Sequence, residues 1–440
     1  MKTLSKFLAL FIFGVVILAG CGGGGEKNSS APTYSINFYD TNLDLIKTVN
    51  IEVKPYNLSD LQSGYTWYTA ESSLPITNYN ITQNISFYAI PSVHEVRNET
   101  QLYNIRDDLN GNYILMNDIA LTEATLNETS GWDPIGDENN PFAGIFNGNR
   151  HKVTDFFMNN TIKIFVGFFG YIDGGTVKNF GLEISEKGIV EASLDMGRNS
   201  DVGSIAGTIY NGIIFNCYSK GNIISSRGTV HIGGIAGSVD NTFMNSCYTV
   251  GDITITGDWA AVGGIAAYAG NSNISNCYSN GNIKITEGNF MSAGGVIGYI
   301  YSTSVNNCYS TGNISVSGWI TAGGIVEHDQ NGISTINNCA AINENISSSS
   351  GSRIGKSSAV NNFANSAMLV NGAVVGDSEY DGIGKTLAEL QTRSTYEDAV
   401  NGNGLGGLGW KFGTNDENPW VWGAFVDYPY PTFYWQTQRP

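Results

Sequence analysis

Residues 232–253 read IGGIAGSVDNTFMNSCYTVGDI, and the chain repeats this pattern several times. Residues 262–283, VGGIAAYAGNSNISNCYSNGNI, carry the same glycines, aliphatic residues and Cys-Tyr pair at the same spacing. Similar copies begin at Val202, Ala293 and Ala322, and a weaker one begins at Val166. A fixed period of this length indicates a repeated structural unit whose copies must stack to bury a common core. The sequence therefore predicts an all-β solenoid of about thirty residues per coil.

Cysteine marks the period of the repeat. Five cysteines follow one another at separations of 30, 30, 31 and 31 residues: Cys217, Cys247, Cys277, Cys308 and Cys339. Stacked strands place equivalent residues about 4.8 Å apart, and neighbouring residues of a strand point to opposite faces. We therefore expect a structural ladder of inward-pointing cysteines. The residue after each of the first four cysteines would form an exposed ladder: Tyr218, Tyr248, Tyr278 and Tyr309.

Two further ladders are expected from the residues around each cysteine. Asparagine precedes four of the five cysteines, at a position where the amides of successive coils could bond one another at a bend: Asn216, Asn276, Asn307 and Asn338. Glycine recurs four residues after a cysteine, as expected for a turn with positive φ: Gly221, Gly251, Gly281 and Gly312.

The repeats resemble the GLUG motif of bacterial surface proteins and adhesins. The flanks fit as well, because GNYILMNDIAL from Gly111 and GWDPIG from Gly131 resemble the usual lead-in, and GWKFG from Gly409 resembles the usual exit. This resemblance covers roughly residues 95–440. It implies a right-handed parallel β-helix-like fold and no defined activity.

The first residues resemble a bacterial lipoprotein signal peptide. Residues 1–20 combine Lys2 and Lys6 with an apolar run that is shorter than the about 20 residues a membrane-spanning helix needs. They lead into Leu-Ala-Gly-Cys, which resembles a lipobox and implies lipid attachment at Cys21. Residues 21–33 are expected to form a flexible tether. Because Gly22 and not aspartate follows the cysteine, resemblance to Gram-negative lipoproteins favours an outer-membrane or cell-surface location.

Three further regions are expected. Residues 34–92 contain four strand-like segments and resemble the internalin-type B-repeat, a small β-grasp-like module. Residues 93–350 would form the solenoid, and residues 351–440 an aromatic-rich C-terminal cap. Within this cap, possible capping boxes at Thr386 and Ser394 predict one or two short helices. Four tryptophans would either close the end of the core or form a sugar-stacking platform: Trp410, Trp420, Trp422 and Trp435.

Composition and motif spacing argue against several classes of partner and ligand. The formal net charge of −17 disfavours nucleic acid, and the charged fraction of 14% is well below the usual value of about 25%. The repeat cysteines lack C-x-x-C spacing, so neither a metal site nor a cofactor is expected. The glycine-rich segment 351–357 is one residue short of a phosphate loop, and the acids of segment 377–382 are interpreted as solvated loop residues and not as calcium ligands.

Three functions remain open. The first is an adhesin or ligand-binding protein that is anchored to the membrane through Cys21 and presents a solenoid wall to glycans or to host or extracellular proteins. The second is a structural lipoprotein of the envelope without a soluble ligand. The third is a polysaccharide-acting β-helix enzyme. No catalytic residue is predicted, because the acids occur singly in different parts of the repeat: Asp201, Asp240, Asp252 and Asp258.

Overall fold

The structure is a computed structural model that describes two compact units, residues 1–91 and 92–440. In the second unit it describes residues 93–436, apart from 161–162, 192–199, 227–229, 257–259, 356, 398–406 and 426–427. In the first unit it describes the backbone of six strands between Thr33 and Pro91. The predicted signal peptide and the predicted lipid attachment at Cys21 lie outside the described residues.

The first unit contains a mixed β-sheet. Its strands are β1 (Thr33–Tyr39), β2 (Leu45–Glu52), β4 (Tyr65–Thr69) and β6 (Ile85–Pro91), in the order β2-β1-β6-β4. The central pair β1–β6 is parallel and the outer pairs are antiparallel. Strands β3 (Pro55–Asn57) and β5 (Asn78–Asn80) form a separate antiparallel pair. All four strand-like segments found in the sequence are thus strands, while the likeness to the B-repeat stays a prediction.

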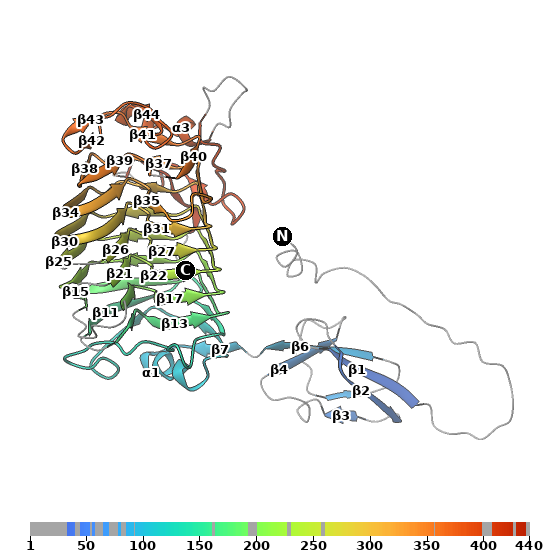
Figure 1. Cartoon of the computed structure of the whole chain (residues 1–440). Coiled ribbons are helices and arrows are strands. Elements are labelled where there is room, and N and C mark those ends of the chain that lie inside the picture. The colour runs from blue at the N-terminus through green and yellow to red at the C-terminus, as the bar shows by residue number, and fades with distance from the viewer. Residues whose placement is uncertain are drawn as a thin grey trace, which may run out of the picture. The chain divides into compact units, whose positions relative to one another are not determined.

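The second unit is a parallel β-solenoid, as its repeats predicted (Figure 1). Each coil pairs in register with the next, so that Tyr218 lies beside Tyr248 and Ile232 beside Val262. A first face is built from the strands β7 (Val93–Val96), β8 (Asn112–Leu115), β10 (Ile145–Asn147), β14 (Thr176–Lys178), β18 (Ile213–Phe215), β23 (Phe243–Asn245), β28 (Asn273–Ser275), β32 (Ser304–Asn306), β36 (Thr335–Asn337) and β40 (Ser358–Val360).

A second face is a six-stranded parallel sheet. Its strands are β13 (Phe169–Asp173), β17 (Ala206–Tyr210), β22 (Ala236–Asp240), β27 (Ala266–Gly270), β31 (Ile297–Tyr301) and β35 (Val326–Asp329).

The remaining coil strands form one connected network, the third face. Its members are β9 (Ile119–Ala120), β11 (Lys152–Asn160), β12 (Phe165–Val166), β15 (Gly181–Glu191), β16 (Ser200–Gly203), β19 (Tyr218–Lys220), β20 (Ile223–Ser225), β21 (Val230–Gly233), β24 (Tyr248–Val250), β25 (Ile253–Thr256), β26 (Ala260–Gly263), β29 (Tyr278–Asn280), β30 (Ile283–Gly294), β33 (Tyr309–Ser310), β34 (Ile314–Gly323), β37 (Ala340–Ala341), β38 (Asn345–Ser347), β39 (Ser350–Ser352), β41 (Phe363–Asn365), β42 (Leu369–Val370), β43 (Ala373–Val374) and β44 (Ile383–Lys385). The coils thus continue beyond residue 350, the predicted start of the cap.

One continuous apolar core fills the solenoid, and the repeat cysteines are part of it. All five are fully buried and have free thiols, as expected for inward-pointing packing residues: Cys217, Cys247, Cys277, Cys308 and Cys339. Burial raises the pKa of the thiols of Cys247, Cys277 and Cys339, because an apolar interior disfavours the thiolate. The cysteines therefore stabilise the fold as small apolar side chains.

The ends of the core are closed differently. At the N-terminal end, α1 (Glu99–Tyr103) and the 3₁₀ turn η2 (Asn104–Asp107) bury Leu102 and Ile105 against the first coil. At the other end lie α2 (Leu387–Leu390) and α3 (Ser394–Glu397). The capping box at Thr386 is confirmed. The one at Ser394 is wrong, because Ser394 is itself the first residue of α3 and does not precede it.

Amide hydrogen bonds join some neighbouring coils along one bend, but the predicted ladder is interrupted at Ser246 and, among the described residues, between Asn307 and Asn338. Asn216 donates to Asn179 over 3.1 Å, and Asn307 donates to Asn276 over 3.3 Å. These asparagines have φ near +50°, a conformation that asparagine tolerates better than most residues. Between the two segments stands Ser246, whose hydroxyl bonds Asn245 instead. The amide oxygen of Asn216 is consequently buried and has no hydrogen-bond partner among the described residues.

Glycine is needed at the predicted ladder positions for two different reasons, a positive φ angle or close approach of the backbone of the preceding coil. Gly221 and Gly251 have φ of +121° and +148°, as expected. The expectation is wrong for Gly281 and Gly312, which do not have positive φ. There a Cβ atom would collide with the carbonyl oxygen of the glycine in the preceding coil, so close stacking of the coils requires glycine.

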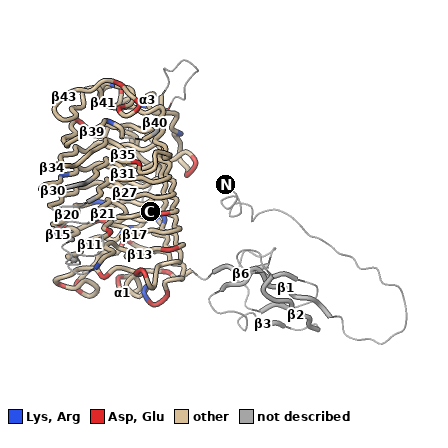
Figure 2. The backbone as a smooth tube through the Cα atoms, in the orientation of Figure 1, with Lys and Arg blue, Asp and Glu red and all other residues tan. Residues whose placement is uncertain are grey.

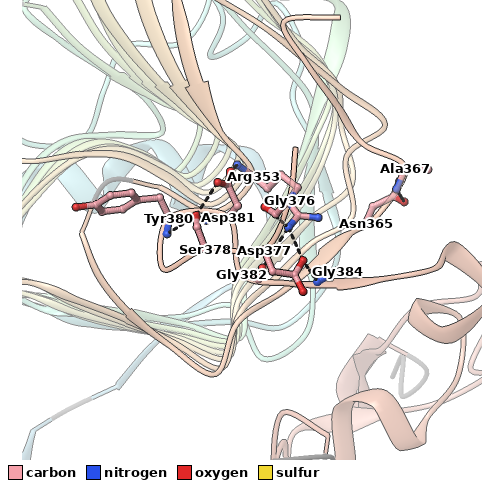
Figure 3. Close-up of polar contacts among 10 residues, drawn as sticks. All are labelled: Arg353, Asn365, Ala367, Gly376, Asp377, Ser378, Tyr380, Asp381, Gly382 and Gly384. Carbon is pink, nitrogen blue, oxygen red and sulfur yellow. Dashed lines mark hydrogen bonds and ion pairs between the residues drawn. The ribbon is translucent and has the colours of Figure 1, made fainter. Parts of the chain in front are cut away.

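Arg353 joins the final coil to the loop that follows it (Figure 3). Its side chain is only 1% exposed, and Nη2 donates to Asp377 over 2.9 Å and to the carbonyl oxygens of Gly376 and Gly382. The amide N–H of Arg353 donates to Asp381. The glycine-rich segment is thus part of strand β39 and its neighbouring turn. The acids of this segment lie in a loop, and the side chain of Asp377 is 61% exposed, in keeping with the prediction of solvated loop residues. In addition, Asp377 and Asp381 both accept hydrogen bonds from Arg353.

Replacing Ser246 with asparagine should repair the amide ladder. The new amide would donate to the buried oxygen of Asn216, and asparagine also suits the φ of +55° at this position. We expect Ser246→Asn to raise the free energy of unfolding by about 0.5–1.5 kcal/mol, measured by thermal or denaturant unfolding. Ser246→Ala is the matched control, since it adds no donor. Equal or lower stability of a folded Ser246→Asn protein would contradict the proposed break.

The ion pair of Arg353 should make the last coil sensitive to acid. Hydrogen bonds from Arg353 and the Gly384 amide lower the pKa of Asp377 in the folded protein. The stabilisation from this carboxylate is therefore present at neutral pH and is lost as the pH falls below about 4. Asp377→Asn should lower the melting temperature at pH 7, and the difference from the parent protein should shrink at pH 3. Glu379→Gln in the same loop serves as control, and an undiminished difference at pH 3 would refute the role of the charge.

Candidate functional site

The tyrosines that follow the repeat cysteines form a continuous ring stack. The ring centroids of Tyr218 and Tyr248 are 5.1 Å apart, those of Tyr248 and Tyr278 are 4.9 Å apart, and those of Tyr278 and Tyr309 are 4.7 Å apart. The rings are within 11° of parallel, because strands β19, β24, β29 and β33 pair in register. The predicted ladder therefore exists and points away from the core.

The tyrosine ladder is nevertheless largely covered, which corrects the predicted exposure of Tyr248, Tyr278 and Tyr309. The C-terminal residues 407–436 pack over it, leaving Tyr248, Tyr278 and Tyr309 at 5%, 2% and 0% exposure and Tyr218 half-buried. Alternation along a strand shows only that a side chain leaves the core. It does not show whether a distant segment covers that side chain afterwards.

The tryptophans of the C-terminal region cover this ladder and do not close the end of the core. Trp410 and Trp420 stack on each other at 4.6 Å and lie beside Tyr309, in a cluster separate from the main core. The indole of Trp420 also donates to Asn276 over 3.1 Å. Strands β45 (Trp420–Val421) and β46 (Thr432–Phe433) and the turn η3 (Tyr434–Gln436) complete this covering segment. Since Trp410 and Trp420 are buried, neither offers an open face for a sugar.

A small pocket remains where the tyrosine ladder and the covering segment end. It has a volume of about 30 Å³, which is room for a few groups the size of a water molecule. Asn216, Tyr218 and Trp435 line it together with Arg150 and Gln436. Within the part of the chain that the structure describes, Oδ1 of Asn216 and Nε1 of Trp435 have no hydrogen-bond partner, and both atoms are buried.

A second row of aromatic rings lies on the second face of the solenoid and was not foreseen from the sequence. Tyr268, Tyr299 and His328 are partners in neighbouring strands. Their ring centroids are 5.7 Å and 5.0 Å apart, and His231 continues the stack at 6.1 Å from Tyr268. Tyr268 and Tyr299 are half-exposed and His328 is exposed. Alignment of the repeats could have revealed this row. The third residue after the successive GGI or GGV triplets is, in order, Ser238, Tyr268, Tyr299 and His328.

This aromatic row lies at a concave bend between two consecutive strands of each coil. Outward-pointing side chains on either side of a convex bend would diverge, but here Thr208 of β17 donates a hydrogen bond to Asp201 of β16, so the two side chains converge. His231, beside Asp201 in the next coil, also contacts Asp201 at 2.8 Å. The row of side chains that begins with Asp201 and His231 continues in later coils with small residues. Ser292 and Thr321 therefore leave the sides of the Tyr268 and Tyr299 rings accessible.

A strongly exposed tryptophan stands beside this bend. Trp319, on β34, is 76% exposed. It lies two residues before Thr321, and Phe290 lies two residues before Ser292, the strand partner of Thr321. Trp259 occupies the same repeat position one coil earlier, although its side chain and that of Phe290 are not among those described. Three successive repeats thus carry an aromatic residue two positions before the row of Ala261, Ser292 and Thr321, although the strand partner of Trp319 is Asn289, because the pairing shifts by one residue there.

The hydroxyl groups of the aromatic row remain protonated at neutral pH. Burial and the neighbouring carboxylate of Asp240 raise the pKa of Tyr268, and burial and Asp329 raise that of Tyr299. Both phenols can therefore donate hydrogen bonds to a ligand. Charged residues are sparse along the coils (Figure 2), which favours a ligand recognised by rings and hydroxyl groups.

The described acids considered for catalysis each have separate hydrogen-bond partners. Asp201 binds Thr208 and His231, Asp240 accepts from Asn271, and Asp252 accepts from the amide of Asn282. Asp258 lies outside the described residues. Among the residues that the structure describes, no group of three or more His, Cys, Asp or Glu side chains could hold a metal ion. None of the helices in this described part has the length and apolar character needed to cross a bilayer.

Comparison with known proteins supports the repeat assignment. Residues 260–286 and 291–315 match the family model described as the GLUG motif, so the predicted resemblance is confirmed for these repeats. A segment of 90 residues is 39% identical to a protein of Evansella cellulosilytica that is provisionally named a Gly-rich membrane protein. This match covers 20% of the chain and only about a tenth of the length of that relative.

Two solved structures share the general architecture. One, from Bacteroides ovatus, is provisionally described as an immunoglobulin A1 protease, with 23% identity, a TM-score of 0.46 and coverage of 78% of this chain and 93% of its own. The other is an IgA1 protease with 16% identity, a TM-score of 0.44 and coverage of 73% and 26%. These likenesses carry no inference about activity.

Proposed function

We propose that the protein is a lipid-anchored surface protein that binds glycans through the aromatic row of the second face. The observation that carries this proposal is the stack of half-exposed and exposed rings formed by Tyr268, Tyr299 and His328. Exposed aromatic side chains that are held rigidly in a row are typical of binding surfaces, since apolar contact then needs little further ordering of the protein.

The chemistry of this bend favours a glycan. The rings supply apolar edges, the phenols supply donors, and Ser292 and Thr321 supply hydroxyl groups in the neighbouring row. Successive coils repeat these groups about every 4.8 Å, so a linear polymer of similar units lying along the solenoid axis would meet the same groups again and again. Trp319 adds a large exposed aromatic surface beside that path.

Attachment to a membrane is the second part of the proposal. The lipobox-like end of the signal peptide supports acylation of Cys21, and the relative from Evansella cellulosilytica carries a membrane-protein name. The anchor would hold the solenoid at an outer-membrane or cell surface. The glycine- and serine-rich segment after Cys21 would give it reach.

Removing two rings of the aromatic row should weaken glycan binding. With about 0.5–1.5 kcal/mol per aromatic contact, Tyr268→Ala combined with Tyr299→Ala should lower affinity about tenfold or more. The assay is retention of the chain from Tyr34 onward on an array of polysaccharides and mucins, with new glycan ends recorded at the same time.

Tyr380→Ala is the matched control, because Tyr380 is 44% exposed and lies in the loop after the last coil. Unchanged retention of the double variant would contradict a role for the aromatic row, and absence of retention on every glycan would contradict the proposed function. New glycan ends would instead indicate a polysaccharide-acting enzyme.

The lipid anchor can be tested in cells. Cys21→Ser should abolish incorporation of a fatty-acid analogue and release the protein from the membrane fraction, because the acylated side chain would be missing. Cys217→Ser is the control, since that thiol is buried in the core. Labelling that persists in the Cys21→Ser protein would exclude this residue as the attachment point.

A further inference from the structure

A further row of outward-pointing side chains lies beside the aromatic row on the second face. It occupies the position two residues later in each strand, and residues at this spacing point to the same side of a sheet. We call it the Tyr/Asp row, and its members are successive strand partners: Asp173, Tyr210, Asp240, Gly270 and Tyr301. Tyr210 is 40% exposed, and Asp173, Asp240 and Tyr301 are half-exposed. Tyrosine rings of two adjacent rows are therefore available to one ligand.

The two aspartates of this row are not neutralised by basic side chains. Their hydrogen-bond donors are neutral, because Asn211 donates to Asp173 over 3.0 Å and Asn271 donates to Asp240 over 3.1 Å. Neither aspartate forms an ion pair with a residue that the structure describes. No lysine or arginine occurs in the six described strands of the second face. The tyrosines of this face thus lie in negatively charged surroundings.

Asp240 lies next to a ring of the aromatic row. Gly270 leaves space in the Tyr/Asp row, and the side chain of Tyr268 leans towards it. A Cβ atom built on Gly270 would lie 2.8 Å from the phenol oxygen of Tyr268 and 3.2 Å from Oδ1 of Asp240. The phenol oxygen and the carboxylate therefore flank the same position. A ligand group that rests beside the Tyr268 ring can contact both oxygens.

An aromatic ring beside an unneutralised carboxylate is suited to a protonated amine. The face of the ring attracts a cation, and the carboxylate accepts charge-assisted hydrogen bonds from it. We propose that the glycan bound by the second face is a polymer of amino sugars with free amines, such as de-N-acetylated poly-N-acetylglucosamine. This inference rests on the proposed glycan binding by the aromatic row and names the class of sugar. A carboxylated or sulfated glycan would meet the aspartates with like charge and is disfavoured.

The repeat of the solenoid suits a stiff polymer with an amine on each unit. Asp173 and Asp240 are two coils apart along the Tyr/Asp row, which is about 10 Å. A polymer of amino sugars carries its amines on rigid rings, so amines at regular intervals can meet both aspartates with little further ordering. A lysine-rich peptide carries the same charge but must fix long flexible side chains, which costs conformational entropy. The surface therefore favours the sugar polymer over a basic peptide.

Isothermal titration calorimetry with the full-length protein tests the role of the amine directly. The ligands are the hexamers of glucosamine and of N-acetylglucosamine, at a slightly acidic pH at which the amines are protonated and the aspartates are ionised. We expect the glucosamine hexamer to bind about fivefold more tightly or better at low ionic strength, because acetylation removes the charged contacts. The difference should shrink as salt is added, since salt screens half-exposed charges.

The variant Asp240→Asn isolates the contribution of one carboxylate. Asparagine retains an oxygen that can accept from Asn271 but carries no charge. The variant should bind the glucosamine hexamer about threefold more weakly and the N-acetylglucosamine hexamer unchanged. Glu186→Gln is the matched control, because it removes one exposed carboxylate from β15 on the third face. If the Asp240→Asn protein does not fold, Asp173→Asn provides the same test two coils away.

Each result that contradicts the inference can be told apart from failure of the proposed function. Equal or tighter binding of the N-acetylglucosamine hexamer would overturn the role of the amine and leave glycan binding by the aromatic row intact. An unchanged preference for glucosamine in both folded aspartate variants would overturn the role of the Tyr/Asp row. Hexalysine is titrated in parallel, and tighter binding of this peptide than of the glucosamine hexamer would overturn the sugar as the ligand. Binding of neither hexamer would overturn this inference, whereas the proposed function fails only if no glycan of the array is retained.

Discussion

The in-register pairing of each coil with the next is the constraint on which the rest of the structure depends. Because strands such as β19, β24 and β29 pair residue for residue, every repeat position becomes a row of like side chains along the axis. Inward rows fill the core with isoleucine, valine and cysteine. Rows of outward-pointing side chains stack aromatic rings on aromatic rings and bring amide groups of successive coils together. A single substitution in one repeat therefore changes the surroundings of two neighbouring coils.

The outward-pointing rows differ in their exposure to solvent, depending on whether another segment of the chain covers them. The tyrosine row that begins at Tyr218 lies beneath the covering segment and joins that segment to the coils through aromatic contacts. The row of Tyr268 and Tyr299 retains partial exposure at a concave bend. Chemically similar rows are thus covered in one place and partly exposed in another. Where a row is interrupted, as at Ser246, a polar group such as Oδ1 of Asn216 is left without a partner among the described residues.

Much of the fold could be predicted from the sequence, because period and alternation are local properties. The spacing of the cysteines fixed the coil length, and their alternation with tyrosine gave the direction of both side chains correctly. The covering of Tyr278 could not be predicted, since its partner Gln436 is 158 residues away and no periodicity links the two. The exposed row of Tyr268 was missed for another reason. Only part of the repeats carries an aromatic residue there, and Ser238 at the same position hides the pattern.

The covering segment has a consequence for the way the chain reaches its native state. Solenoid coils contact mainly their neighbours, so their folding can spread from one repeat to the next. The hydrogen bond between Asn216 and Asp416 instead spans 200 residues and cannot form before the last part of the chain has been made. Until the last part of the chain has been made, the tyrosine row of the early coils is therefore open to water. Docking of the last residues is a late, non-local step, of the kind that slows folding and gives exposed aromatic surface time to meet other chains.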